Sequence, residues 1–355
     1  MLPQTNRLLK GVVVDMICIR ADGGQELGLG HIMRCISIAS AIKSAGEEVC
    51  FILADENPVE FLRTRSLRYY VLESDYRQME EEIDRLAPVL EKEKPNLILV
   101  DSYFVTEEYM IQLRKFAPLA YLDDMGVIPF SADILINYNI FADYDMYREK
   151  AKQYLLGVAY APLRTEFVQV DYPVRKNATG ILLTTGGSDR YNLAGKFLDR
   201  ILESEHLRHM DCYVVSGAYN PNLPYLEDRA KEHKNVHICR NVTNMCELMQ
   251  KCDVAVTAGG STMYELSAVG VPMVCFSFVD NQEQIVRGFE ERNLVAFAGD
   301  YLSQKEDMIL LGIKALEQLT KDFEARERES RQLRETVDGM GAMRIASALI
   351  RMEKK

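Results

Sequence analysis

Short apolar runs alternate with amphipathic helical patterns along most of this chain, and this alternation limits its possible folds more than any other feature. The first half holds six runs, at residues 17–19, 49–53, 69–72, 97–100, 119–122 and 134–137. Strands that alternate with helices form a parallel sheet that helices cover on both faces. The sequence therefore predicts an α/β fold with a doubly wound parallel sheet.

The same alternation resumes after a break, which predicts a second domain. Residues 158–176 carry two prolines and a polar stretch, and they are the best candidate for a linker. Six more runs follow, at residues 180–185, 212–216, 236–239, 254–257, 273–276 and 295–297. The chain of 355 residues also exceeds what one core supports, roughly 250–300 residues. We expect Rossmann-like domains at 16–160 and 177–320, followed by C-terminal helices at 321–355.

The composition narrows the classes of partner. A formal net charge of −11 argues against nucleic acid and membrane surfaces, because both attract clustered Lys and Arg. No stretch reaches the length of a membrane span, about 18 apolar residues. Residues 1–15 lack the features of a signal peptide and are given no functional role. We expect a cytoplasmic monomer or weak homodimer, with its eight cysteines as buried thiols.

The first candidate site is a glycine turn between a predicted strand and a predicted helix. Gly28 and Gly30 precede His31, and glycines allow a positive φ and a close approach of the backbone to a ligand. The helix that follows directs free N–H groups and the positive end of its dipole at the same place. An imidazole held there can exchange a proton near neutral pH, so His31 is the candidate base. A purely structural histidine is the alternative.

A second glycine turn is the most specific pattern in the chain. It follows an apolar run and brings Gly259, Gly260, Ser261 and Thr262 to the start of a predicted helix. The N–H groups and the two hydroxyls of this turn can hold a diphosphate without a lysine. Glu265, one helical turn further, can accept hydrogen bonds from both hydroxyls of a ribose. The alternative makes Ser261 an N-cap and Glu265 a residue that compensates the helix dipole.

Two more polar segments follow predicted strands. Gly187 lies in the turn 185–189, and Gln282 lies in the cluster 280–284. Neither a Walker A motif nor a complete Gly-x-Gly-x-x-Gly motif is present, and no two histidines near these turns have the spacing of metal ligands. We therefore expect neither a cofactor nor a metal. Sheets of this kind bind ligands at the carboxyl ends of their strands, so the turns should line a cleft between the domains.

Several motifs together resemble a known family. They are Ile19-Arg20-Ala21-Asp22, Gly28 to Cys35, Asp101-Ser102-Tyr103, Asp123-Asp124, Ala258 to Thr262 with Glu265, and Asn281-Gln282. In this order and spacing they resemble the UDP-2,4-diacetamido-2,4,6-trideoxy-β-L-altropyranose hydrolases of pseudaminic acid biosynthesis, and spore coat polysaccharide proteins are similar too. The resemblance runs from about residue 16 to residue 297. It implies the two-domain GT-B architecture that is also found in glycosyltransferases.

The resemblance implies catalytic roles for three residues. His31 matches the catalytic histidine, Tyr103 an active-site tyrosine, and Asn281 an asparagine that faces the cleft. A ring packed at a strand end is the alternative for Tyr103. Arg20 and Arg34 are interpreted as anchors of the acidic loops around them and as candidate contacts of the substrate.

The resemblance also implies a UDP site. Glu265 matches a ribose-binding glutamate, and Ser261 and Thr262 match a turn that binds the diphosphate. The backbone near Asn241 and Val242 lies where the uracil would stack.

The expected reaction is hydrolysis of a UDP-sugar at the anomeric carbon, with water activated by His31. A nucleoside diphosphate leaves as a stabilised anion, so one base and a set of fixed N–H dipoles suffice, whereas ordinary glycosidases use two carboxyl groups. A GT-B glycosyltransferase with the same donor and a non-catalytic nucleotide-sugar sensor are the alternatives. Two interpretations are possible for Asp101, Asp123 and Asp124, as helix caps or as residues that bind the sugar.

Overall fold

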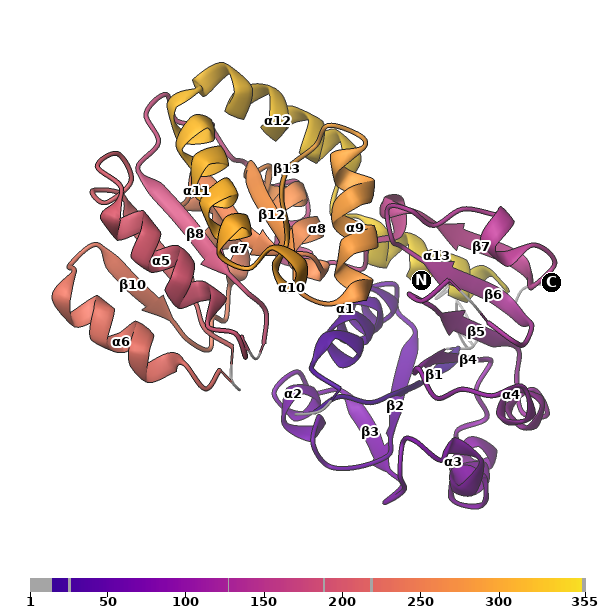
Figure 1. Cartoon of the computed structure of the whole chain (residues 1–355). Coiled ribbons are helices and arrows are strands. Elements are labelled where there is room, and N and C mark those ends of the chain that lie inside the picture. Colours follow the sequence, from indigo (N-terminus) through magenta and orange to yellow (C-terminus); the bar gives the residue numbers. More distant parts are fainter. Residues whose placement is uncertain (1–14, 25–26, 127, 188, 218–219, 353–355) are drawn as a thin grey trace, which may run out of the picture.

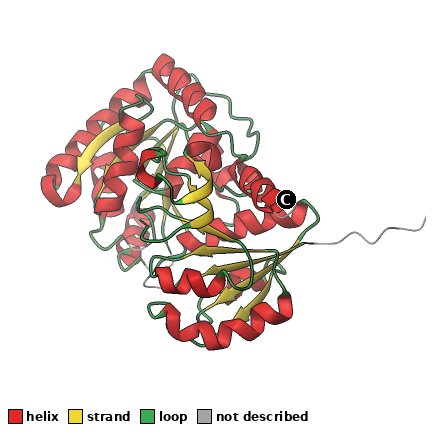
Figure 2. Ribbon diagram, turned by 90° about the vertical axis from the view of Figure 1, so that its right-hand side faces the viewer, coloured by secondary structure: helices red, strands yellow, loops and turns green. Residues whose placement is uncertain are grey.

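Two lobes follow one another along the chain, and each is a parallel sheet flanked by helices (Figure 1). This computed structural model describes residues 15–352 except 25–26, 127, 188 and 218–219. Helices cover both faces of each sheet (Figure 2). The α/β class with two doubly wound parallel sheets, predicted from the alternation of strands and helices, is confirmed.

The first sheet has the strand order β3-β2-β1-β4-β5-β6-β7. Its strands are β1 (Met16–Ala21), β2 (Glu48–Leu53), β3 (Arg68–Val71), β4 (Leu97–Asp101), β5 (Leu119–Leu122), β6 (Ala132–Asn137) and β7 (Ala151–Leu156). The helical segments of this lobe are α1 (Gly30–Ser44), α2 (Val59–Arg63), η1 (Met79–Glu82), α3 (Ile83–Glu93), α4 (Glu107–Leu113) and η2 (Asp145–Tyr147). Alternate residues of β1 enter two cores: Ile17 and Ile19 pack with α1, and Cys18 packs on the other face with α3.

The second sheet has the order β10-β9-β8-β11-β12-β13. Its strands are β8 (Gly180–Thr184), β9 (Asp211–Val215), β10 (Val236–Cys239), β11 (Val254–Ala258), β12 (Met273–Ser277) and β13 (Ala296–Asp300). The helices are α5 (Leu193–Glu203), α6 (Leu223–Glu232), α7 (Met245–Gln250), α8 (Ser261–Val269), α9 (Asp280–Glu290), α10 (Tyr301–Gln304) and α11 (Glu306–Lys321). The segment between the sheets contains η3 (Val158–Tyr160) and η4 (Thr165–Phe167).

The C-terminal helices tie the lobes together. Helix α12 (Phe323–Thr336) packs against α8, and α13 (Gly341–Met352) returns to the first lobe and packs against α1. One continuous apolar cluster contains Ile32 and Ile140 from the first lobe together with Tyr264 from the second and Ile345 from α13. The two lobes therefore share buried apolar surface.

The main departure from the sequence analysis is β7, which was not predicted. Only Leu155 of this strand is buried, and Lys152 and Gln153 are exposed. An edge strand of this kind gives a weak apolar signal. All eight cysteines are free thiols and seven are buried. No helix in the described part of the chain is long and apolar enough to cross a membrane.

Candidate active site

Both candidate glycine turns lie where the strand order of a sheet reverses. In the first sheet β1 and β4 are neighbours, and the chain leaves them in opposite directions, toward β2 and toward β5. Strands β8 and β11 have the same relation in the second sheet. Doubly wound sheets bind ligands in the crevice at such a switch point. The turns before α1 and before α8 are thus at the ligand-binding edges of their sheets.

Helix α1 begins without a side-chain cap. Leu29 occupies the N-cap position, makes no side-chain hydrogen bond there, and is followed by no acidic residue in the first turn. The first N–H groups of the helix are thereby left for solvent or a ligand. Gly28 has a φ of 77°, as the sequence predicts, whereas Gly30 has a negative φ. A Cβ at Gly30 would meet open space, so the expected conformational need for glycine holds at Gly28 only.

His31 is held by Asp101, the last residue of β4. Its Nδ1 lies 2.6 Å from Oδ1 of Asp101. Burial alone would raise the pKa of Asp101, but Arg34 and His31 outweigh it and hold the pKa below its usual range. An ionised carboxylate only accepts hydrogen bonds, so this contact favours the tautomer with the proton on Nδ1 and the basic nitrogen at Nε2; Nη2 of Arg34 also lies 3.1 Å from Nδ1. His31 is only 6% exposed, and is more enclosed than its position on a cleft turn predicts.

Arg34 connects this pair to a second carboxylate. Its Nε donates to Asp101 at 2.7 Å, and its Nη1 donates to Asp124 at 2.7 Å and to the Tyr138 hydroxyl at 3.2 Å. The side chain is only 9% exposed. Arg34 therefore anchors the ends of β4 and β5, as the sequence predicts, while direct contact with a substrate remains a prediction.

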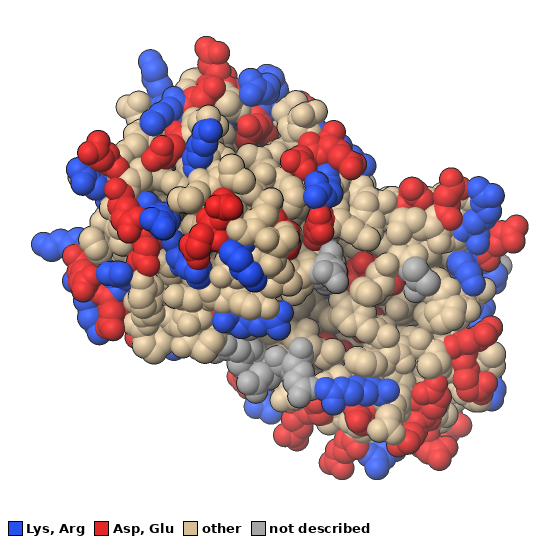
Figure 3. Space-filling view, viewed as in Figure 1, with Lys and Arg blue, Asp and Glu red and all other residues tan. Residues whose placement is uncertain are grey.

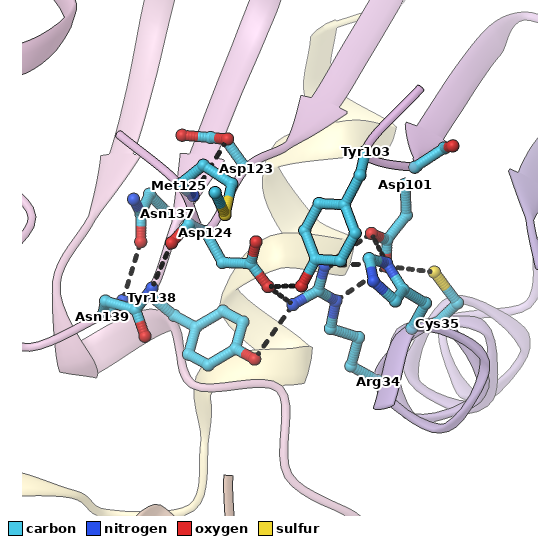
Figure 4. A network of polar contacts seen from close by, with 12 residues as sticks. Arg34, Cys35, Asp101, Tyr103, Asp123, Asp124, Met125, Asn137, Tyr138 and Asn139 are labelled. Carbon is cyan, nitrogen blue, oxygen red and sulfur yellow. Dashed lines mark hydrogen bonds and ion pairs between the residues drawn. The ribbon is translucent and has the colours of Figure 1, made fainter. Parts of the chain in front are cut away.

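Tyr103 forms the outer wall over His31. The two rings meet edge to face with centroids 4.4 Å apart, and the Tyr103 hydroxyl donates to Oδ2 of Asp124 at 3.0 Å. Burial and then Asp124 keep the pKa of Tyr103 above its usual value, so the hydroxyl is protonated at neutral pH. Figure 4 shows Tyr103, Asp124 and Tyr138 converging on Arg34 from the ends of three neighbouring strands. Tyr103 is 44% exposed and is the accessible member of this group.

The start of α8 offers backbone donors and two hydroxyls. Gly260 is the N-cap, no side chain caps the helix, and no acidic residue lies in its first turn. The interpretation of Ser261 as an N-cap is wrong, because Ser261 is the first residue of the helix itself. A Cβ at Gly259 would overlap Gln282 and Val286 of α9, so glycine is required there by close packing. This arrangement matches an anion site in which the N–H groups are unobstructed.

Glu265 lies in the second turn of α8 and pairs with a residue that the sequence analysis missed. Arg164, from the segment between the sheets, lies 3.1 Å from Oε1 of Glu265 and 3.3 Å from Glu166. Burial raises the pKa of Glu265, and Arg164 opposes this shift. Because only Oε1 is engaged by Arg164, Oε2 is available for a ligand hydroxyl.

The remaining sequence-predicted residues have different surroundings. Gly187 follows β8, and its backbone is so close to Gly217 that a Cβ at Gly217 would overlap it. Asn241 has a φ of 49° in the loop after β10, where Val242 is half-buried against the main core. Gln282 accepts a hydrogen bond from the Phe278 N–H at 3.1 Å and so stabilises the turn before α9.

Asn281 lies in the first turn of α9, but its side chain is outside the described part of the structure, so its role stays a prediction. Among the described residues, no group of three or more His, Cys, Asp or Glu side chains is arranged to hold a metal ion.

Arg20 differs from its expected role as a substrate contact. The residue is fully buried and donates to Asp22 and, through two nitrogens, to Glu82 at 2.7 and 2.8 Å. The Tyr109 hydroxyl donates to the same Glu82 carboxylate. The guanidinium is enclosed by these groups, so Arg20 anchors β1 to η1 and is not accessible to a ligand.

We predict that Arg20→Met lowers the free energy of unfolding by about 3–5 kcal/mol, because it leaves buried carboxylates without their partner. Urea denaturation checks this value, and Arg63→Met is the control, since the exposed Arg63–Glu60 pair should contribute about 0–1 kcal/mol. UDP affinity should be unchanged in the folded Arg20→Met protein. Loss of UDP binding with stability intact would restore the ligand role of Arg20.

A hollow separates the two lobes on the face that Figure 3 presents. Lys, Arg, Asp and Glu side chains are interspersed over the outer parts of this face, and the visible floor of the hollow carries few of them. The position agrees with the cleft that the two switch points predict.

Known proteins resemble this chain in sequence along most of its length. No family model matches it. It is 25% identical over 272 residues to the UDP-2,4-diacetamido-2,4,6-trideoxy-beta-L-altropyranose hydrolase of Campylobacter jejuni, a match that covers 75% of this chain and 93% of that protein. The spore coat polysaccharide biosynthesis protein SpsG of Bacillus subtilis is 25% identical over 340 residues, covering 93% and 96%. The uncharacterized protein MJ1062 of Methanocaldococcus jannaschii is 28% identical over 276 residues, which is 73% of this chain. The match covers about half (54%) of that relative.

Solved structures share the fold at much lower sequence identity. MurG of Acinetobacter baumannii superposes with a TM-score of 0.67 at 11% identity, covering 95% of this chain and 100% of that one. The spinosyn rhamnosyltransferase SpnG, complexed with thymidine diphosphate, gives a TM-score of 0.65 at 12% identity, covering 96% and 100%. The chain thus resembles the UDP-diacetamido-trideoxy-altropyranose hydrolases and SpsG in sequence, and it has the two-domain GT-B fold of glycosyltransferases.

Proposed function

We propose that this protein processes a nucleotide-sugar, and that it hydrolyses a UDP-sugar at the anomeric carbon to release UDP and the free amino sugar. The proposal rests on the His31–Asp101 pair at the switch point of one sheet, together with an uncapped, hydroxyl-bearing helix start at the switch point of the other. The name of the hydrolase that resembles this chain suggests the substrate, a UDP-linked 2,4-diacetamido-2,4,6-trideoxy-altrose or a close relative.

In this proposal each lobe carries one half of the reaction. Nε2 of His31 takes a proton from water as its oxygen bonds to the anomeric carbon, and Asp101 stabilises the imidazolium that forms. The bond from the anomeric carbon to the diphosphate oxygen breaks, and the electron pair leaves with UDP. The N–H groups and hydroxyls of Ser261 and Thr262 stabilise the charge on the departing diphosphate. Tyr103 orients the water or a sugar substituent.

The test is to incubate the protein with the UDP-linked diacetamido sugar and to follow UDP release with and without added carbohydrate or lipid acceptors. The proposal expects release at the same rate in both conditions. Release only when an acceptor is present would replace hydrolysis by glycosyl transfer.

Glycosyl transfer is the second candidate, and one surface feature favours it. Tyr103 and Met125 are 44% and 58% exposed beside Asp124, and Met146, 37% exposed, packs against Gly126 in the adjoining turn. An apolar rim of this kind, next to the base, suits an acceptor with an apolar part. The same His31–Asp101 pair would then deprotonate a hydroxyl of the acceptor.

A prediction on nucleotide recognition follows from Glu265. Glu265→Gln should weaken UDP binding about 10- to 100-fold, because hydrogen bonds from ribose hydroxyls to a carboxylate contribute about 1.5–3 kcal/mol. Calorimetric titration measures this, with Glu290→Gln as the control, since Glu290 is partly exposed and pairs with Arg287. The wild type should prefer UDP over 2′,3′-dideoxy-UDP, and Glu265→Gln should lose that preference. If the variant keeps it, Glu265 does not bind the ribose.

A further inference from the structure

We infer that a three-residue segment after β6, here called the bridge (Tyr138, Asn139 and Ile140), sets the position of the proposed base, His31, relative to α8, here called the nucleotide helix. The inference rests on the proposed function. It adds two positioning residues, Tyr138 and Tyr264, that belong to neither of the two glycine turns. It begins from the observation that the bridge contacts both α1 and α8.

The bridge reaches the base through Arg34. The Tyr138 hydroxyl accepts a hydrogen bond from Nη1 of Arg34 at 3.2 Å, and the guanidinium lies 5.7 Å from the centroid of the Tyr138 ring. Arg34 in turn bonds Asp101, which holds the imidazole of His31. A displacement of Tyr138 is therefore transmitted to the histidine through three charge-assisted contacts, Tyr138–Arg34, Arg34–Asp101 and Asp101–His31.

The bridge reaches the nucleotide helix through Tyr264, which precedes Glu265 in α8. The Tyr264 hydroxyl donates to Oδ1 of Asn139 at 3.2 Å and accepts from the N–H of Ile140 at 3.3 Å. The rings of Tyr138 and Tyr264 also meet edge to face, with centroids 5.5 Å apart. Both residues are buried, so these contacts act without competition from water.

Helix α9 and the turn that follows it hold the bridge at Ile140. Nη2 of Arg292 donates to the carbonyl oxygen of Ile140 at 2.9 Å, and a Cβ at Gly288 would overlap the Ile140 side chain. Ile140 is thus enclosed by α8 and α9 of the second lobe while its own strand belongs to the first sheet. The described contacts thus lead from Arg34 of α1 through Tyr138 and Tyr264 to α8, and this geometry holds the two lobes together.

The test is Tyr264→Phe, which keeps the ring and removes both hydroxyl contacts with the bridge. We expect UDP release to fall about 10-fold in kcat, because a small misplacement of the base is costly, while the Kd for UDP stays within about twofold. Tyr172→Phe is the matched control: its buried hydroxyl also bonds across the chain, to Cys252, but touches no member of the bridge. Tyr138→Phe should behave like Tyr264→Phe, and the double variant should lose less than the product of the two effects, because both act in one chain of contacts.

A distance measurement separates this inference from the proposed function. Spin labels on the exposed Glu60 of α2 and Lys231 of α6 report on the relative position of the lobes, whatever reaction the protein performs. The distance distribution should broaden in Tyr264→Phe and stay unchanged in Tyr172→Phe. A narrow distribution in Tyr264→Phe, or a kcat within twofold of the wild type, overturns the inference. If the wild-type protein releases no UDP from the sugar, the proposed function fails, and the spin-label distances alone decide whether the bridge holds the lobes.

Discussion

Replacing His31 by alanine should lower the rate of UDP release about 10²- to 10⁴-fold, the usual contribution of a general base. The imidazole of His31 bonds Asp101 through Nδ1, which leaves Nε2 to take the proton, whereas His206 bonds Thr320 and His237 bonds Asp211. UDP affinity should stay within about twofold, because the proposed nucleotide contacts belong to the other lobe.

Steady-state kinetics and calorimetric titration of His31→Ala check both halves of this prediction. His206→Ala is a suitable control, since that side chain bonds Thr320 on the far side of the second lobe. Turnover of His31→Ala at the wild-type rate would remove the base from the account. A parallel loss of UDP binding would mean that the substitution had damaged the cleft as a whole.

The second large effect is expected for Asp101→Asn. An amide in place of the carboxylate can donate to Nδ1 of His31, which would move the ring proton to Nε2 and abolish its basicity. We expect a loss of about 10²- to 10⁴-fold in kcat, as in other enzymes whose histidine loses its orienting aspartate. The same change should cost about 3–5 kcal/mol of stability, because Arg34 loses its buried partner.

The stability effect should depend on pH in a defined direction. The pKa of Asp101 is lowered in the folded protein, so its stabilising contribution is complete above the unfolded-state value of about 3.9 and is lost as the pH falls below it. Acid titrations of unfolding should therefore be steeper below about pH 4 for the wild type than for Asp101→Asn.

Asp133→Asn provides the control for both readouts. Asp133 is also buried, pairs with Arg114 and Lys152, and has a lowered pKa, but it lies at the start of β6, away from the cleft. This variant should lose acid-dependent stability and keep its turnover. Equal kinetic losses in the two variants would contradict a specific role for Asp101.

The sequence predicts the fold and the location of the candidate site, because both depend on local patterns. Buried parallel strands are continuous apolar runs, and the turns with Gly28 and Gly259 follow such runs directly. The general rule for doubly wound sheets gives which strands become neighbours. The proximity of His31 to the end of β4 could therefore be predicted. Strand β7 could not be predicted, because its exposed, polar residues are extended through their pairing with β6.

The partners of the site residues could not be predicted, since they come from distant segments. Arg164 joins Glu265 across about a hundred residues, and Tyr264 joins Asn139 across more than that. Arg20 illustrates the converse error. Its motif resembles those of the cleft residues, so the sequence suggests a ligand contact. In the structure, however, Arg20 lies within β1, and its side chain points into the interior and bonds Glu82.

In the proposed reaction, a base from one lobe and a nucleotide site from the other act on the two sides of one anomeric carbon. Hydrolysis of the UDP-linked diacetamido sugar in water labelled with heavy oxygen, followed by mass spectrometry of both products, tests this most directly. We predict the label in the free sugar and none in UDP, because water attacks carbon and the diphosphate keeps its bridging oxygen. Label in UDP would show attack at phosphorus and would contradict the assignment of His31 and α8 to opposite sides of the sugar.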